Sequence, residues 1–146
     1  MKEKLNKLMS ALNKAFIARR KLYLNRSQAF GLYVGQPQVL NYVRQHPGCT
    51  QIEIAENLGV SSASIAFSTK RLQKAGLLQK QINSLNMRCN KLYVTPEGES
   101  VLDNFRSAYD EMNSNMFEGF TAEELDQLLD YTERFIQNIE KMTAED

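Results

Sequence analysis

The stretch TQIEIAENLGVSSASIAFSTKRLQKAG, residues 50–76, encodes two short helices separated by a tight turn. Thr50 and Glu53 have the spacing of a capping box, which marks the start of a helix. Gly59 is a typical residue at a helix C-terminus, and Ser61 follows it as the N-cap of a second helix. The stretch therefore predicts a helix-turn-helix in which GVS is the turn.

Two segments with strand character follow this stretch. They are LLQKQI (77–82) and NKLYVT (90–95), and the polar loop NSLNMRC (83–89) separates them. Two strands joined by a loop directly after a helix-turn-helix predict a β-wing.

Helices are predicted on both sides of this unit, because apolar residues recur there at helical spacing. The fold class is therefore expected to be mainly α with a small β-wing, in a single domain of residues 1–146. The predicted helices are an amphipathic helix over 3–24, a short helix over 37–46, a long helix that starts at Pro96, and a final helix that starts at the capping box of Thr121 and Glu124.

Composition disfavours several classes of protein. Apolar residues make up 42% and charged residues 24%, which is ordinary for a soluble globular protein. No apolar run approaches the roughly 18 residues of a membrane helix, and no secretory signal is recognisable, so a cytoplasmic protein without a membrane partner is expected. Cys49, Cys89 and the single histidine, His46, lack the spacing of a zinc site or a disulfide scaffold. No catalytic group, cofactor or metal is expected, because no nucleophile elbow, phosphate-binding glycine loop or ligand cluster occurs.

Charge is distributed unevenly along the chain. The overall net charge is only +1, but residues 1–52 hold nine Lys/Arg and one acid, whereas residues 97–146 hold three bases and fourteen acids. Residues 57–96 contain six bases and no Asp or Glu. Double-stranded DNA is a dense polyanion that Lys and Arg bind by displacing its counterions, and a carboxylate would repel it. The acid-free segment therefore indicates a surface that faces DNA.

The helix of residues 61–75 has two faces if successive residues turn by about 100°. One face is expected to pack on the domain: Ile65, Ser68, Thr69, Leu72 and Ala75. The opposite face carries Ala63, Phe67, Lys70, Arg71 and Lys74. Phe67 has two interpretations, since it either packs on a neighbouring element or contacts thymine methyl groups in the major groove.

The candidate DNA contacts come from this helix and from the wing. Hydroxyls at a helix N-terminus suit phosphate oxygens, and a wing arginine suits the narrow minor groove of A·T-rich sequence. The candidates are Ser61, Ser62, Ser64, Phe67, Lys70, Arg71 and Lys74 of the helix, and Asn86, Arg88 and Lys91 of the wing.

Four further stretches form a recognisable set: GQPQVLNYV (35–43), CTQIEIAENLGVSSASI (49–65), LQKAGLLQK (72–80), and the wing motif Asn86-Met87-Arg88 followed by Thr95-Pro96-Glu97-Gly98. Through their order and spacing, nearly the whole chain resembles the MarR family of winged-helix transcription regulators. The spacing from Arg88 to Thr95 agrees with the family pattern, but Asn86 stands where the family commonly has an acid.

The resemblance implies a division into two lobes. Residues of about 30–96 would form a winged helix-turn-helix DNA-binding lobe, and residues 1–28 and 97–146 would form a helical dimerisation lobe from both termini. A homodimer is expected in any case, because one helix-turn-helix covers too little DNA for high specificity. The candidate dimerisation residues are Leu5, Leu8, Leu12, Leu125, Leu128, Phe135, Ile136 and Ile139.

The leading hypothesis is a homodimeric transcription regulator, a repressor that binds a palindromic operator. In relatives, a small aromatic or anionic effector relieves repression, and Met9, Met112 and Met116 either line such a pocket here or belong to the core. Two alternatives remain: a winged helix that binds proteins instead of DNA, and a redox sensor that uses Cys89 beside Arg88. Cys49 is expected to be a small buried hydrophobic residue.

Overall fold

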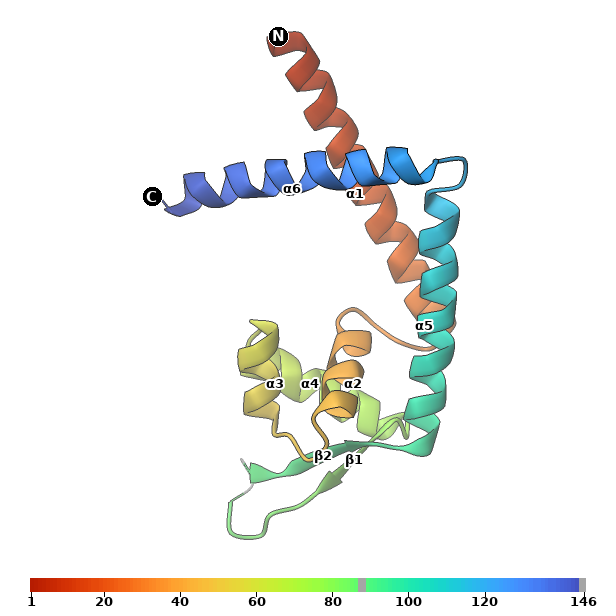
Figure 1. The fold of residues 1–146 in the computed structure, drawn as a ribbon. Coiled ribbons are helices and arrows are strands. Elements are labelled where there is room, and N and C mark those ends of the chain that lie inside the picture. The colour runs from red at the N-terminus through yellow and green to blue at the C-terminus, as the bar shows by residue number, and fades with distance from the viewer. Residues whose placement is uncertain (87–88, 145–146) are drawn as a thin grey trace. The chain divides into compact units, whose positions relative to one another are not determined.

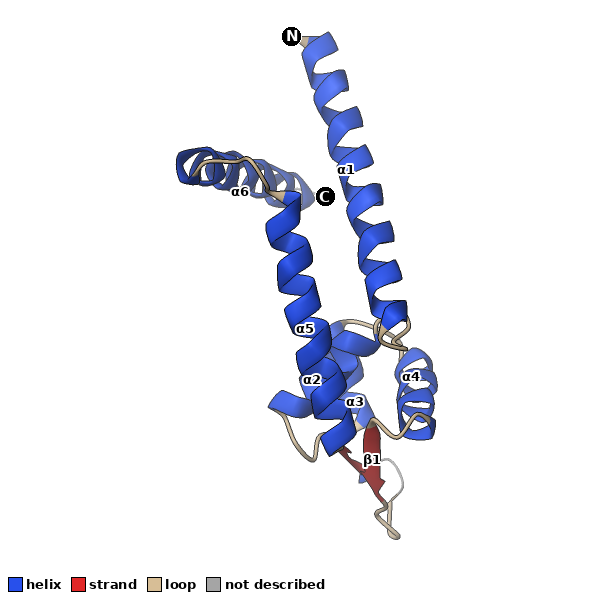
Figure 2. Ribbon diagram, turned by 90° about the vertical axis from the view of Figure 1, so that its right-hand side faces the viewer, coloured by secondary structure: helices blue, strands red, loops and turns tan. Residues whose placement is uncertain are grey.

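The computed structural model describes residues 1–86 and 89–144 and confirms the predicted fold class. The chain forms two compact units, Met1–Asp110 and Glu111–Asp146. The helices and strands follow in the order α1 (Lys2–Ala29), α2 (Gln36–Gln45), α3 (Gln51–Leu58), α4 (Ser62–Lys74), β1 (Leu78–Gln81), β2 (Lys91–Val94), α5 (Pro96–Met116) and α6 (Ala122–Ala144) (Figures 1 and 2).

The helix-turn-helix forms through the local hydrogen bonds that its sequence predicts. The Thr50 hydroxyl accepts a hydrogen bond from the Glu53 amide at 3.3 Å, and the Glu53 carboxylate accepts one from the Thr50 amide at 2.6 Å. Gly59 adopts φ 63°, the left-handed conformation that ends α3. The Ser61 hydroxyl then accepts from the amide of Ser64 at 3.2 Å and caps α4.

The bonds from the Thr50 amide and hydroxyl hold the pKa of the Glu53 carboxyl below its usual range. Because the folded-state pKa is lowered, the capping box stabilises the fold above the unfolded-state pKa, and this effect is lost as pH falls through the folded-state pKa.

The wing is a two-stranded antiparallel sheet that is anchored to the start of the helix-turn-helix. Leu78 lies opposite Val94, and Gln81 lies opposite Lys91, so both strands are shorter than the segments 77–82 and 90–95. Leu92 is fully buried and bonds the chain before α3: its amide donates to the Cys49 carbonyl at 2.9 Å, and its carbonyl accepts from the Gly48 amide at 2.8 Å. The wing is thus fixed to the chain just before α3 as well as to α4.

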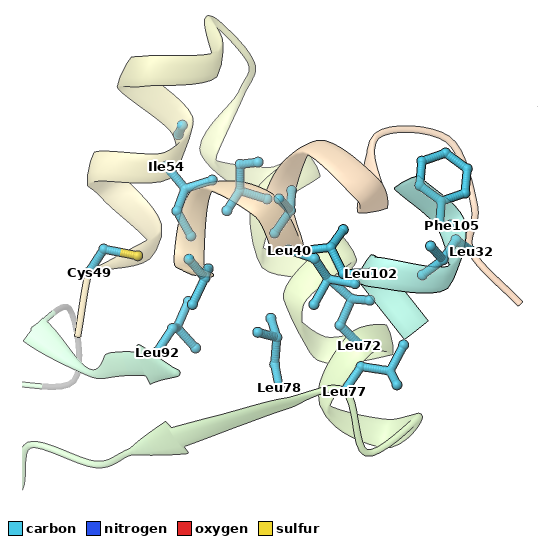
Figure 3. Close-up of a cluster of buried hydrophobic side chains, with 14 residues drawn as sticks. Leu32, Leu40, Cys49, Ile54, Leu72, Leu77, Leu78, Leu92, Leu102 and Phe105 are labelled. Carbon is cyan, nitrogen blue, oxygen red and sulfur yellow. The ribbon is translucent and has the colours of Figure 1, made fainter. Parts of the chain in front are cut away.

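The hydrophobic core of the first unit joins the helix-turn-helix, the wing and the start of α5 (Figure 3). The polar side chain of Thr69 is fully buried beside this core. The Thr69 hydroxyl donates to the Ile65 carbonyl at 2.9 Å and accepts from the Gln51 amide nitrogen at 2.8 Å, so its burial leaves no hydrogen-bonding group without a partner. The core side chains are Leu32, Val39, Leu40, Val43, Cys49, Ile54, Ala55, Ile65, Leu72, Leu77, Leu78, Leu92, Leu102 and Phe105.

The structure corrects two expectations. The first helix does not end near residue 24 but continues to Ala29. Its last residues have no apolar stripe from which this could be predicted. In this part of the helix the buried Ser27 hydroxyl donates a hydrogen bond to the Tyr23 carbonyl at 3.0 Å. Ala75 is exposed and not part of the packed face of α4, because the helix ends at Lys74 and the chain turns away at Gly76 with φ 77°.

The second unit contains the last residues of α5 and all of α6. The predicted capping box is confirmed, since the Thr121 amide donates to the Glu124 carboxylate at 2.9 Å and the Glu124 amide donates to the Thr121 hydroxyl at 3.2 Å. Every described residue of α6 is exposed in the single chain. Within residues 1–86 and 89–144, no helix is both long and apolar enough to cross a membrane.

Thr95 and Gly98 join the end of the wing to α5. The Thr95 hydroxyl donates to the Gly76 carbonyl at 2.6 Å and accepts from the Gly98 amide at 3.0 Å. Gly98 packs so closely on the chain after α4 that a Cβ there would lie 2.2 Å from the Leu77 carbonyl oxygen and 2.8 Å from a methyl group of Val94. The backbone contact explains why this position requires glycine.

Gly98→Ala is therefore expected to lower the free energy of unfolding by about 1–3 kcal/mol, the usual cost of forcing extra atoms into a packed site. Urea denaturation followed by circular dichroism measures this. Ser100→Ala, on an exposed position of the same helix turn, is the matched control and is expected to leave stability nearly unchanged. Equal stability of Gly98→Ala and the parent would contradict the close approach.

Candidate nucleic-acid interface

One face of α4 is buried and the other is exposed, as its sequence predicts. Ile65, Thr69 and Leu72 are buried, and Ser68 is half-buried. The exposed side chains include Ala63, Phe67, Lys70 and Lys74, and the Phe67 side chain is 63% exposed. Phe67 therefore does not pack into the core, which leaves a large apolar ring on a cationic surface.

The N-terminus of α4 presents serine hydroxyls and free amides. Ser61, Ser62 and Ser64 are all exposed. The Ser61 hydroxyl serves as the N-cap and also lies 2.8 Å from the Ser64 hydroxyl, so these two groups are ordered by each other. Amides of the first helical turn point outward at a helix N-terminus, where they favour an anion.

A groove of about 690 Å³ separates α3 and the first half of α4 from the wing. The groove contains Lys80, an exposed base of β1 that the candidate contacts above omit. Its place in the acid-free segment was the signal that could have identified it. The groove is lined by Gln51, Ile52, Ser62, Ala63, Ala66, Lys80, Asn90 and Leu92.

The wing loop is shaped by asparagine side chains. The Asn83 carboxamide oxygen accepts hydrogen bonds from the amides of Leu85 at 3.0 Å and Asn86 at 3.3 Å, and the Asn90 oxygen accepts from the Asn83 amide at 2.8 Å. Asn86 and Lys91 are exposed, as expected of candidate DNA contacts. Arg88, the predicted minor-groove residue, lies outside the described residues.

Arg71 differs from the other bases of α4 because it is half-buried. Its guanidinium carbon lies 3.7 Å from the ring centroid of Tyr33 and 5.5 Å from that of Phe67. Tyr33 belongs to the connection between α1 and α2 and was not among the sequence-based candidates. No local pattern predicts this contact, since the two residues are far apart in the chain.

The cysteines do not form a metal or disulfide site in the part of the chain that the structure describes. Cys49 is buried, as predicted, and burial together with the nearby Glu53 carboxylate raises the pKa of its thiol to about 11. The protonated thiol is a poor nucleophile at neutral pH. Cys89 is a free, exposed thiol. No group of three or more His, Cys, Asp or Glu side chains suitable for a metal ion occurs among the described residues.

A separate cavity of about 410 Å³ lies where α1, α2 and α5 meet in the first unit. The Tyr23 ring stands nearly perpendicular to the rings of Phe105 and Tyr109, with centroids 5.8 and 5.6 Å away. Burial raises the pKa of Tyr23, so its hydroxyl stays neutral. The methionines considered above, Met9, Met112 and Met116, do not line this cavity. Its lining consists of Tyr23, Pro37, Gln38, Asn41, Arg44, Gln45, Leu102, Phe105, Arg106 and Tyr109.

Comparison with known proteins agrees with the geometry of the interface. A family model described as winged helix-turn-helix DNA-binding matches residues 36–79, from α2 to the first residues of β1. The uncharacterized HTH-type transcriptional regulator YybA of Bacillus subtilis (strain 168) is 29% identical over 107 residues, which are 73% of this chain and 71% of that protein.

Solved structures share the fold of the whole chain. The crystal structure of a MarR family transcription regulator superposes with a TM-score of 0.82 at 21% identity and covers 100% of this chain and 99% of that one. The crystal structure of the S. aureus MepR–DNA complex has a TM-score of 0.65 at 18% identity and covers 88% and 94% of the two chains. Residues 36–79 therefore match a winged helix-turn-helix DNA-binding domain, and the whole chain has the fold seen in a MarR family transcription regulator.

Proposed function

We propose that the protein is a homodimeric repressor that binds a palindromic operator in the cytoplasm and inserts α4 into the major groove. The observation that carries the proposal is the exposed face of α4, which presents Phe67, Lys70 and Lys74 in a segment of forty residues, 57–96, without a carboxylate. An α-helix fits the major groove of B-DNA. The similarity to MepR, which has been crystallised with DNA, supports the same use of the fold.

The contacts divide into two kinds. One kind of contact is to the phosphates. Charged contacts come from Lys70, Lys74, Lys80 and Lys91, and uncharged hydrogen bonds come from the serine hydroxyls and amides at the start of α4. Phe67 has no charge and reads sequence by contact with thymine methyl groups. Arg88 of the wing is assigned to the minor groove beside the site, because A·T-rich sequence narrows that groove and attracts arginine. Asn86 is assigned to DNA contact through the same wing loop.

Titration of Lys74→Ala and Phe67→Ala against operator and scrambled duplex at several salt concentrations tests this division. Lys74→Ala is expected to weaken binding to both duplexes about equally. It is also expected to reduce the salt slope, the slope of log affinity against log salt concentration, by roughly one. Phe67→Ala is expected to leave the salt slope unchanged and to lower discrimination between the duplexes, without loss of stability because the side chain is exposed.

Lys141→Ala on α6 is the matched control for removal of one positive charge. It is expected to change neither the salt slope nor the discrimination between operator and scrambled duplex. Equal salt slopes for Lys74→Ala and the parent would contradict the phosphate contact. Absence of salt-dependent binding by the parent to any duplex would favour the alternative, a winged helix that binds proteins.

The dimer is assigned to the apolar stripes of α1 and α6. Side chains of both stripes are 38–55% exposed in the single chain, an unusual amount of apolar surface for a soluble monomer. The occupant we propose is a second copy, because α1 carries eight bases and one acid whereas α6 carries two bases and six acids, so the helices of two copies attract each other. The stripe residues are Leu5, Leu8, Leu12, Leu125, Leu128, Phe135, Ile136 and Ile139.

Ile136→Asp is expected to convert the dimer to a monomer, because it places a charge in the buried interface. Sedimentation velocity measures the oligomeric state. Gln137→Asp adds the same charge on the polar face of the same helix and is expected to remain a dimer. A dimeric Ile136→Asp variant with unchanged operator affinity would show that α6 is not the interface.

The cavity between α1, α2 and α5 is the site that we assign to a small aromatic anion. Its aromatic rings suit an aromatic ligand, and Arg106 supplies an exposed positive charge at its lining. Arg44 is already paired, since its guanidinium lies 2.6 Å from the Asp103 carboxylate. A ligand in this cavity would contact both α2 and α5. It relieves repression only if it binds the DNA-free protein more tightly than the DNA-bound protein.

Benzoate is the probe for this cavity. Operator binding is expected to weaken as benzoate is added, and Arg106→Ala is expected to remove the effect while it leaves operator binding without benzoate unchanged. Arg134→Ala, which removes an arginine that lies outside the cavity, is the matched control. The same benzoate response in Arg106→Ala as in the parent would refute the assignment.

A further inference from the structure

The connection between α1 and α2 is built to hold one exposed aromatic ring in place. Leu32 is fully buried in the core, and the Gln36 side chain is 3% exposed. The Gln36 side-chain oxygen accepts from the Tyr33 amide at 2.9 Å, and the Gln36 amide donates to the Tyr33 carbonyl at 3.0 Å. Gly35, with φ 80°, turns the chain into α2. The backbone of Tyr33 is thus fixed on both sides, while its side chain remains 51% exposed.

The fixed ring lies against the guanidinium of Arg71 on α4. The separation of 3.7 Å between the Arg71 guanidinium carbon and the Tyr33 ring centroid is well inside the range of about 6 Å for a cation–π contact. The Phe67 ring, one helical turn earlier, lies at 5.5 Å. The long arginine side chain is therefore ordered before any ligand binds.

The contact orders Arg71 without using its hydrogen bonds. An aromatic ring stacks on the face of the guanidinium, whereas the N–H donors point outward in its plane and match two oxygens of a phosphate. Arg71 is half-buried at the flank of the exposed face, beside the more exposed Lys70 and Lys74. From this position the Arg71 guanidinium is better placed to contact the DNA backbone at the edge of the major groove than the base edges at its centre.

We propose that Tyr33 is a positioning residue for DNA binding, which holds Arg71 in the orientation that bonds a backbone phosphate. This rests on the proposed function of α4. Ordering a long side chain on binding costs free energy, and a side chain that is already ordered avoids this cost. The connection between α1 and α2 thereby contributes to DNA affinity through Arg71, although Tyr33 itself carries no charge.

A double-mutant cycle on the full-length protein tests the proposal, with operator and scrambled duplex titrated at several salt concentrations. Arg71→Ala is expected to weaken both duplexes equally and to lower the salt slope by roughly one. Tyr33→Leu keeps every charge, so it is expected to weaken both duplexes about two- to tenfold with an unchanged salt slope. Tyr33→Phe keeps the ring and is expected to bind as the parent does.

The decisive comparison is Tyr33→Leu in the Arg71→Ala background, where no further loss of affinity is expected because the residue acts through Arg71. An equal loss in both backgrounds, or a Tyr33→Phe variant as weak as Tyr33→Leu, would overturn the proposal, and thermal unfolding confirms that each variant is folded. Greater loss on operator than on scrambled duplex would overturn the phosphate assignment in favour of base contact. If Arg71→Ala binds as tightly as the parent, the proposal falls while the proposed function stands; if the parent binds no duplex, both fall.

Discussion

The rotation of α4 about its own axis is the constraint on which the rest of the molecule depends. Thr69 fixes it: the hydroxyl is fully buried and bonded both to the preceding turn of α4 and to Gln51 at the start of α3. Ile65 and Leu72 pack on the same side. A turn of the helix by one residue would bury Lys70 in place of Thr69, and burial of an unpaired ammonium costs far more than any contact it would gain. The exposed face is therefore the only one that α4 can offer to a ligand.

The parts of the fold that depend on local hydrogen bonds and periodicity were predictable from the sequence. The capping boxes at Thr50 and Thr121, the left-handed glycine that ends α3, and the buried side of α4 all follow from spacing over a few residues. Ala75 was misplaced because periodicity continues the helix past the point where the chain turns. The Tyr33–Arg71 contact was missed because it joins distant segments, and no property of either residue alone indicates the partner.

Local charge matters more than net charge in this protein. A net charge of +1 gives no reason to expect affinity for a polyanion. The acids are concentrated after residue 96, however, so α4 and the wing themselves carry bases and no acid. The same segregation gives α1 and α6 opposite charges, which would favour their pairing in the proposed dimer. Exposed ion pairs contribute little stability, so the apolar stripes would supply most of the stability of that dimer.

The measurement that tests the central claim most directly is methylation protection on a duplex selected from random DNA by the full-length protein. Dimethyl sulfate attacks guanine N7, which lies in the major groove. A helix in that groove at each of two half-sites predicts two protected clusters about one helical turn apart, related by a two-fold axis. Uniform reactivity along a duplex that the protein demonstrably retains would contradict the insertion of α4 into the major groove.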